Sequence, residues 1–207
     1  AFEKLNCKSQ TFKLKADSGE ADVLELIIGL NGDDDVHGIL IQLPLPLHLD
    51  SKKILYSVSP DKDVDGFHPH NLGLLLEGNP NFIPCTPHGV LEILKFYNIP
   101  VSGRHAVIVG RSNIVGKPMF ALLSQKFEMG NATVTICHTG TKDLISHTKR
   151  ADILIAAAGS PEMITGDMVK EGVYIVDVGI NRVEDNSEKG YRLVGDVNTS
   201  SVMGIAH

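Results

Sequence analysis

The fold is decided by the stretch Arg104-His105-Ala106-Val107-Ile108-Val109-Gly110-Arg111-Ser112-Asn113-Ile114-Val115-Gly116-Lys117-Pro118. Its apolar run, residues 106–109, is typical of a parallel strand that is covered on both faces. Gly110 permits a tight turn because it carries no Cβ, and Ser112 or Asn113 can cap a following helix. The stretch therefore predicts a buried strand, a glycine turn and a helix.

A glycine turn that leads into a helix presents free backbone N–H groups, which favour a bound phosphate. The glycine spacing here is G-x-S-x-x-x-G, whereas the usual dinucleotide turn reads G-x-G-x-x-G. On this stretch alone, a phosphate site and an ordinary strand-turn-helix stay open as interpretations.

Three further apolar runs predict strands, and each of them ends in small or polar residues. The runs cover residues 132–137, 152–157 and 173–178, and a polar-tipped hairpin is expected over 182–193. The tripeptides that follow the runs are His138-Thr139-Gly140, Ala158-Gly159-Ser160 and Gly179-Ile180-Asn181. Ligands bind at the carboxyl ends of parallel strands, although simple turn chemistry also explains such tripeptides.

The residues after the second of these strands indicate which nucleotide would bind. NAD-binding units usually place an acid there to hold the ribose 2′-OH. This chain instead places His138, Thr139 and nearby Lys142 there, with Arg111 in the glycine turn. These side chains suit a 2′-phosphate, so the sequence favours NADP without excluding NAD.

The chain before residue 85 is expected to combine helices, short strands and a charged loop. Helices are predicted over 21–30 and 51–57, and strands over 11–15 and 38–43. Gln42 lies at the end of the second predicted strand, where a satisfied buried amide is the simpler interpretation and a ligand contact the functional one. In the charged loop Asp61-Lys62-Asp63-Val64-Asp65, one carboxylate could point into a cleft.

The stretch Pro84-Cys85-Thr86-Pro87 marks the expected domain junction. Thr86 is a natural N-cap and Pro87 a natural first residue of a helix that ends near Tyr97. We therefore expect one domain over residues 1–85 and a second over 86–207.

Composition narrows the class of protein. The 207 residues carry a net charge of −6 without a basic cluster, which argues against a nucleic-acid partner. The three cysteines are far apart, so we expect neither a disulfide framework nor a zinc site, and a reducing, cytoplasmic compartment fits. Since no apolar run reaches about 18 residues, we expect no membrane span. The acidic turn 33–35 and the pair His68 and His70 lack neighbouring ligands, so we expect no metal site.

Taken together, the sequence closely resembles the bifunctional methylenetetrahydrofolate dehydrogenase/methenyltetrahydrofolate cyclohydrolase family over essentially its whole length. The stretches that carry the resemblance are residues 36–46 (VHGILIQLPLP), 61–66 (DKDVDG), 83–87 (IPCTP), 110–118 (GRSNIVGKP), 177–181 (DVGIN) and 195–197 (GDV). Each stretch alone is a weak signal, but all six in the family's order are specific.

The resemblance implies an α/β fold with two α/β domains, a cleft between them, and a Rossmann-like parallel sheet in the second. It implies NADP-dependent oxidation of 5,10-methylenetetrahydrofolate, hydrolysis to 10-formyltetrahydrofolate, a homodimer formed through the cofactor domain, and a place in one-carbon metabolism and purine biosynthesis. In the first domain, Asp65 would hold the pterin and Gln42 would lie beside the one-carbon unit. Cofactor contacts are implied for Gly110, Arg111, Ser112, Thr139, Ala158, Gly159 and Ile180.

Two family features are not found in these 207 residues. They are a Tyr-x-x-x-Lys motif upstream of Ala1, whose lysine polarises the substrate, and a Pro-Gly-Gly-Val-Gly-Pro loop with a closing helix after Ile205. We expect truncation to account for both. The alternatives are an NADP-dependent reductase of another small ring, similar to shikimate dehydrogenase, and a cofactor-binding fragment without turnover.

Overall fold

The computed structural model describes residues 2–207. The chain divides into two compact units, which comprise the residues up to Val64 (the first unit) and Asp65–His207 (the second unit). The expected domain boundary between residues 85 and 86 stays a prediction.

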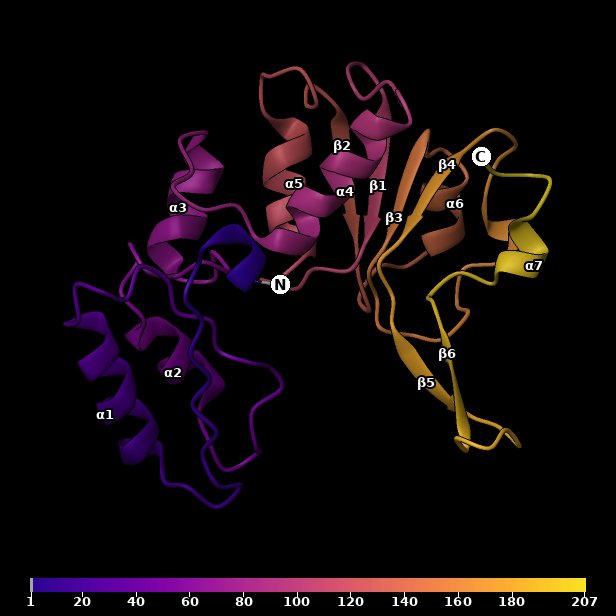
Figure 1. The fold of residues 1–207 in the computed structure, drawn as a ribbon. Coiled ribbons are helices and arrows are strands. Elements are labelled where there is room, and N and C mark those ends of the chain that lie inside the picture. The colour runs from indigo at the N-terminus through magenta and orange to yellow at the C-terminus, as the bar shows by residue number, and fades with distance from the viewer. Residues whose placement is uncertain (1) are drawn as a thin grey trace. The chain divides into compact units, whose positions relative to one another are not determined.

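The second unit is built on a four-stranded parallel sheet (Figure 1). Its strands are β1 (His105–Val109), β2 (Thr133–Cys137), β3 (Ile153–Ala156) and β4 (Tyr174–Asp177), in the order β2-β1-β3-β4. β1 pairs with β2 on one side and with β3 on the other. All four strands run in the same direction, so their carboxyl ends lie at one edge of the sheet. The predicted α/β class and the predicted parallel strands are confirmed.

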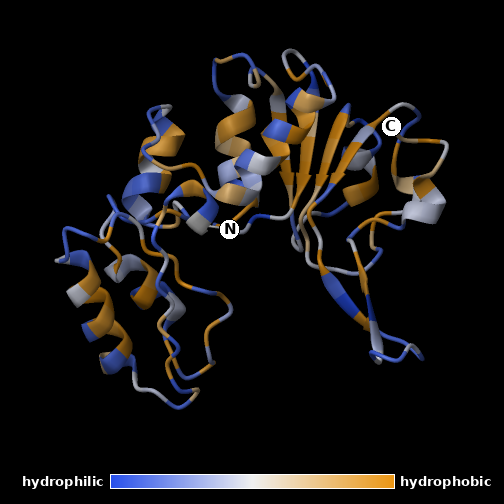
Figure 2. Cartoon of the chain, viewed as in Figure 1, coloured by the Kyte–Doolittle hydropathy of each residue, from blue (hydrophilic) through white to orange (hydrophobic). Residues whose placement is uncertain are grey.

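The sheet separates two hydrophobic cores because alternate residues of each strand point to opposite faces. On β1, Ala106 and Ile108 belong to one core, whereas Val107 and Val109 belong to the other. Figure 2 shows that the central strands β1 and β3 are largely hydrophobic, as strands covered on both faces require.

Helices from several parts of the chain supply the rest of these cores. The helices of the second unit are α3 (Pro69–Glu77), α4 (Cys85–Phe96), α5 (Gly116–Ser124), α6 (Leu144–Thr148), η2 (Gly166–Met168) and α7 (Thr199–Val202). α4 and α5 pack into the core that contains Ile108, and residues of α6, η2 and α7 pack into the core that contains Val107. Across the described residues, no helix combines the length and apolar character that a bilayer span requires.

The start of α4 differs from the prediction. The helix begins at Cys85, and Pro84 occupies the N-cap in place of Thr86. The carbonyl of Pro84 accepts the first helical hydrogen bond, from the N–H of His88 at 3.0 Å. Thr86 was a plausible cap by residue type, but the prediction was wrong because an N-cap is set by backbone conformation, and Pro84 occupies that position with a non-helical backbone.

The predicted hairpin is confirmed. β5 (Asn181–Glu184) pairs with β6 (Tyr191–Val194) in an antiparallel two-stranded sheet. The guanidinium of Arg182 lies 4.2 Å from the centre of the Tyr191 ring, which is a cation–π contact across the two strands.

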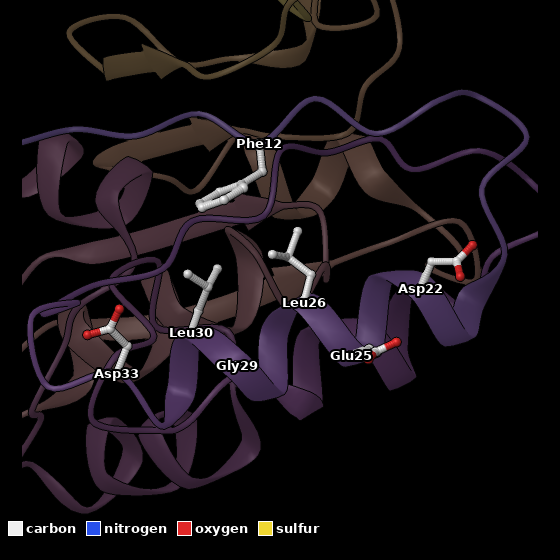
Figure 3. A pocket seen from close by; sticks show the side chains of 7 residues that line it. All are labelled: Phe12, Asp22, Glu25, Leu26, Gly29, Leu30 and Asp33. Carbon is white, nitrogen blue, oxygen red and sulfur yellow. The ribbon is translucent and has the colours of Figure 1, made fainter.

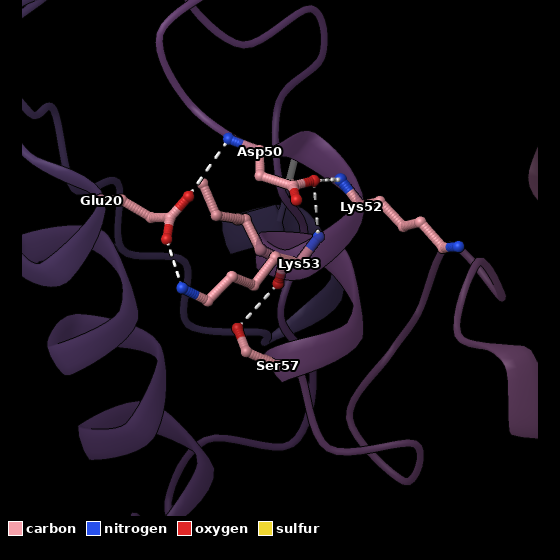
Figure 4. Close-up of polar contacts among 6 residues, drawn as sticks. Glu20, Asp50, Lys52, Lys53 and Ser57 are labelled. Carbon is pink, nitrogen blue, oxygen red and sulfur yellow. Dashed lines mark hydrogen bonds and ion pairs between the residues drawn. The ribbon is translucent and has the colours of Figure 1, made fainter.

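The first unit contains η1 (Phe2–Leu5), α1 (Glu20–Asn31) and α2 (Ser51–Ser57). Its core comprises Val23, Ile27, Ile39, Ile54 and Val58. A polar clasp also joins the starts of α1 and α2 (Figure 4). In this clasp, the Glu20 carboxylate accepts from the Lys53 ammonium and, at 3.2 Å, from the N–H of Asp50, the N-cap of α2.

The predicted strands at residues 11–15 and 38–43 are not formed. Among the described residues of the first unit, pairing is limited to an isolated bridge between Ile39 and Asp63. Residues 11–15 are exposed and pair with no other strand. After residues 38–43, Pro44 and Pro46 have no N–H that could extend a strand pairing. The predictions were wrong because apolar alternation does not by itself supply the neighbouring strand.

Lys62 has a structural role that explains a lysine inside the acidic loop. Its ammonium donates to the carbonyl oxygens of Leu30, Asn31 and Asp33 at 3.0, 2.8 and 2.7 Å. These groups lie at and just beyond the C-terminus of α1, where carbonyls have no helical partner and a cation is favoured.

Asp152 provides a test of stability at the amino edge of the second unit's sheet. Its carboxylate accepts from Lys170 at 2.5 Å and from the N–H of His105 at 2.8 Å, and these bonds lower the pKa of Asp152. Because the pKa of Asp152 is lowered in the folded state, its ionised carboxylate contributes to stability at pH values above the unfolded pKa, about 3.9. This contribution to stability is lost as the pH falls through the folded-state pKa. We expect Asp152→Asn to lower the free energy of unfolding by about 1 kcal/mol at pH 7, with a smaller difference in acid. Urea unfolding of the wild type and the variant at pH 7 and in acid checks this. A stability difference between the two proteins that does not depend on pH would contradict it.

Candidate functional site

The residues predicted to contact a cofactor all follow strands of the parallel sheet. They are Gly110, Arg111 and Ser112 after β1, Thr139 after β2, Ala158 and Gly159 after β3, and Ile180 after β4. The sheet therefore brings the four loops to one edge (Figure 1). β1 and β3 are neighbours in the sheet, and the chain leaves β1 toward β2 before it crosses back to β3. In open parallel sheets, ligands bind outside the carboxyl ends of the strands at a switch of this kind.

Gly110 allows the ends of β1 and β3 to meet without a side chain between them. Its φ is +137°, and a Cβ at this position would lie 2.1 Å from the carbonyl oxygen of Ala157. The N–H of Ala157 in turn donates to the carbonyl of Val109 at 2.8 Å. The glycine is therefore required by backbone conformation and by close approach together.

The second glycine of the motif explains its unusual spacing. A Cβ on Gly116 would lie 2.2 Å from the carbonyl oxygen of Gly110, so α5 can begin against the turn only with glycine there. The Ser112 hydroxyl oxygen accepts from the N–H groups of Val115 at 3.0 Å and Gly116 at 3.4 Å. The N-cap of α5 is Val115, which makes no side-chain capping bond, so the prediction that Ser112 or Asn113 caps the helix was wrong. The turn at residues 113–115 separates both side chains from the N-cap position, and Asn113 accepts from Lys117 at 2.7 Å.

The turn between β1 and α5 has the properties of an anion site. Within the described chain, the backbone N–H groups of residues 111–114 donate to no acceptor. The dipole of α5 adds partial positive charge there, and the exposed Arg111 adds a full charge. The Ser112 oxygen only accepts in its bonds from Val115 and Gly116, so its hydrogen remains available to a phosphate oxygen. These groups fit the pyrophosphate of a dinucleotide.

The loop after β2 is compact and leaves Thr139 exposed at its tip. The N–H of His138 donates to the Thr141 hydroxyl at 2.8 Å, and the N–H of Gly140 donates to Nδ1 of His138 at 3.0 Å. Burial raises the pKa of the Cys137 thiol at the end of β2, which keeps the thiol neutral and favours a packing role.

The loop after β3 is held by a carboxylate to which we assigned no role from the sequence. Asp196 is fully buried, and it accepts from the N–H groups of Ala158, Gly159 and Ser160 at 2.6, 2.9 and 2.9 Å. The motif Gly195-Asp196-Val197 was visible in the sequence, but nothing local to it indicates that its carboxylate serves a loop more than thirty residues earlier.

The loops after β3 and β4 leave room for a flat group. Nothing lies within 4 Å of the point where a Cβ on Gly159 would be, so the face of this loop is open. The side chain of Ile180 is 81% exposed, and among the described residues its N–H has no recorded acceptor. An open glycine and a free backbone donor fit a nicotinamide and its carboxamide.

The two predicted folate residues belong to different units, Gln42 to the first and Asp65 to the second. Gln42 is exposed, and its amide donates to the carbonyl of Leu43 at 3.0 Å, so the expected buried amide is wrong. Residues 40–43 form no strand, and Pro44 has no N–H with which to continue one. Asp65 is half-buried and precedes Gly66, whose φ of +67° marks a turn. The proposed folate roles of both residues stay predictions.

A pocket of about 470 Å³ in the first unit contains none of the predicted site residues (Figure 3). Its lining residues come from α1, its C-terminal turn and the extended segment before it. They are Phe12, Asp22, Glu25, Leu26, Gly29, Leu30 and Asp33. The pocket therefore does not mark the predicted site.

Two family models match the chain. Residues 84–207 match the tetrahydrofolate dehydrogenase/cyclohydrolase NAD(P)-binding domain, and residues 1–65 match the tetrahydrofolate dehydrogenase/cyclohydrolase catalytic domain.

Curated relatives carry the name bifunctional protein FolD. The one from Chlorobium phaeobacteroides (strain BS1) is 51% identical over 203 residues, which cover 97% of this chain and 68% of the relative. The one from Chlorobium chlorochromatii is 52% identical over 207 residues, which cover 99% of this chain and 70% of the relative. The chain thus spans somewhat more than two thirds of their length.

Solved structures agree with these sequence matches. The bifunctional FolD methylenetetrahydrofolate dehydrogenase/cyclohydrolase from Campylobacter jejuni is 48% identical with a TM-score of 0.89, and the match covers 99% of this chain and 70% of that one. The Trypanosoma brucei dehydrogenase-cyclohydrolase, complexed with NADP cofactor and inhibitor, is 36% identical with a TM-score of 0.84, covering 92% and 65%.

Proposed function

This chain belongs to the tetrahydrofolate dehydrogenase/cyclohydrolase family, and from that premise we propose that it oxidises 5,10-methylenetetrahydrofolate and hydrolyses the product. In the first reaction, a hydride leaves the one-carbon bridge and 5,10-methenyltetrahydrofolate forms. NADP, when bound, supplies the hydride acceptor. In the second reaction, water opens the methenyl ring to 10-formyltetrahydrofolate and a proton is released.

The observation that carries the proposal is the edge of the parallel sheet, where an anion-binding turn and an open loop follow neighbouring strands. We propose that the turn at Gly110, Arg111 and Ser112 holds the cofactor phosphates through free N–H groups, a hydroxyl and a guanidinium. Thr139, at the exposed tip of the next loop, would contact the adenosine end. His138 and Arg111 would favour the 2′-phosphate of NADP.

The loops after β3 and β4 are proposed to place the nicotinamide. Ala158 and Gly159 would lie against the ring, because the open space over Gly159 admits a flat group. The backbone N–H of Ile180 would donate to the carboxamide. These residues orient the ring toward the folate, and holding two reactants in register can itself lower the barrier substantially.

The folate contacts are proposed from the first family domain. Asp65 would accept from the adjacent ring N–H and amino groups of the pterin as a two-point, charge-assisted partner. Gln42 would lie beside the one-carbon unit and orient the lysine of the family's Tyr-x-x-x-Lys motif. That motif is not among these 207 residues.

The roles of the two domains, the assembly of the protein and its compartment extend the proposal. We propose that residues 1–85 serve the folate and residues 86–207 serve NADP, and that two copies assemble through the cofactor-binding domain. The widely spaced cysteines favour a reducing compartment, so we place the protein in the cytoplasm. The 10-formyl product would supply one-carbon units to purine biosynthesis.

The test is spectrophotometric. With 5,10-methylenetetrahydrofolate and NADP, the product of the complete open reading frame is expected to generate NADPH. With 5,10-methenyltetrahydrofolate alone, it is expected to accelerate loss of the methenyl absorbance. Activity on a shikimate-type ring in place of folate, or no turnover of either folate, would overturn the proposal.

A further inference from the structure

We propose that Asp196 is a positioning residue for hydride transfer, which acts by holding the two loops that face the nicotinamide. The inference rests on the proposed function, because it takes Ala158, Gly159 and Ile180 as the residues that meet the cofactor.

The carboxylate of Asp196 is a fully buried anchor with four recorded donors. Its Oδ2 accepts from Ala158 and Gly159, and its Oδ1 accepts from Ser160. The fourth donor is Nδ2 of Asn181 at 2.8 Å, the residue next to Ile180. One carboxylate thus joins the loop after β3 to the beginning of β5.

A second carboxylate fixes the anchor itself. Oδ1 of Asp177, the last residue of β4, accepts from the N–H groups of Gly179 at 2.9 Å and Asp196 at 3.0 Å. Its Oδ2 accepts from the N–H of Val197 at 3.0 Å. The end of β4, the loop that follows it and the backbone of Asp196 therefore hold one another in place.

The arrangement makes Asp196 a positioning residue and not a catalytic one. Both of its oxygens are occupied by donors from the protein, and the side chain has no exposed surface. The N–H groups of Ala158 and Gly159 point at the carboxylate, so the loop is left to present its Cα and carbonyl side to a ligand. In the described chain, all four donors to the Asp196 carboxylate are backbone or side-chain amide N–H groups.

The experiment compares the two activities of one protein, because hydrolysis of the methenyl compound consumes water and does not use the nicotinamide. Asp196→Asn would put an NH₂ group where an oxygen accepts two hydrogen bonds, so the loops lose their register. In the product of the complete open reading frame, we expect dehydrogenase kcat/KM for NADP to fall at least about tenfold, with a raised KM and a lowered kcat. We expect the cyclohydrolase rate to stay within about twofold of wild type.

Two companion variants keep the test decisive. Asn181→Ala removes one donor and retains the carboxylate, so it should shift KM for NADP in the same direction by less, and it decides the matter if Asp196→Asn does not fold. Asp34→Asn, in the exposed turn after α1, is the matched control and should leave both activities unchanged.

The outcomes separate the two proposals. A parallel loss of both activities in Asp196→Asn and Asn181→Ala would show a general structural role and overturn the inference. Unchanged dehydrogenase kinetics in both variants would also overturn it while leaving the proposed function intact. Absence of both activities in the wild type would instead overturn the proposed function, and the inference with it.

Discussion

Gly110→Ala is expected to abolish NADP binding and to lower the free energy of unfolding of the second unit by about 3 kcal/mol or more. Two costs add at this residue. An L side chain rarely adopts a φ of +137°, and the new Cβ would lie 2.1 Å from the carbonyl oxygen of Ala157. Relief requires the ends of β1 and β3 to separate, which displaces the N–H groups of residues 111–114 from a bound phosphate.

The measurements are urea unfolding and calorimetric titration with NADP. Gly73→Ala is the matched control, because Gly73 lies inside α3 and a Cβ there would meet nothing within 4 Å. Alanine is preferred over glycine in a helix, so we expect the control to gain about 0.5–1 kcal/mol in stability and to bind NADP normally. Wild-type NADP affinity in Gly110→Ala would contradict the proposed role of the turn.

Asp65→Ala is expected to weaken folate binding by about 2 kcal/mol or more, which corresponds to a loss of affinity of about 30-fold. The physical reason is that the variant leaves paired pterin donors without an acceptor while their water has been removed. The measurement is a titration of the product of the complete open reading frame with tetrahydrofolate.

Two comparisons make this result specific. Asp61→Ala changes an exposed carboxylate in the same charged loop and should retain wild-type folate affinity. NADP affinity should be unchanged in both variants, since neither carboxylate belongs to the loops that follow the strands of the parallel sheet. A folded Asp65→Ala protein with unaltered folate affinity would refute the role of Asp65.

The parts of the fold that were predicted correctly depend on signals that lie close together in the chain. The strand at 105–109 and the turn at Gly110 follow from an apolar run that ends in glycine. The hairpin of β5 and β6 follows from two alternating segments with a polar tip. The resemblance to the folate family is confirmed by the family models. It could be predicted because the order of the motifs is a property of the sequence itself.

The predictions that were wrong needed a partner that local sequence cannot name. Residues 11–15 alternate as a strand does, yet in the described structure they have no neighbouring strand to pair with. Thr86 has the side chain of an N-cap, yet the backbone of Pro84 provides the cap. Gln42 was expected to be a buried amide, yet it lies exposed where the chain turns into Pro44.

By itself, the sequence determined the family, the parallel sheet of the second unit and the turn at Gly110, because apolar periodicity and glycine stereochemistry act over a few residues. Only the tertiary structure decided why Gly116 follows six residues later and what Asp196 does. A Cβ on Gly116 would meet the carbonyl of Gly110, and the Asp196 carboxylate reaches N–H groups more than thirty residues earlier in the chain. Close approach and long-range hydrogen bonding exist only after the chain has folded, which is why these two roles cannot be inferred from neighbouring residues.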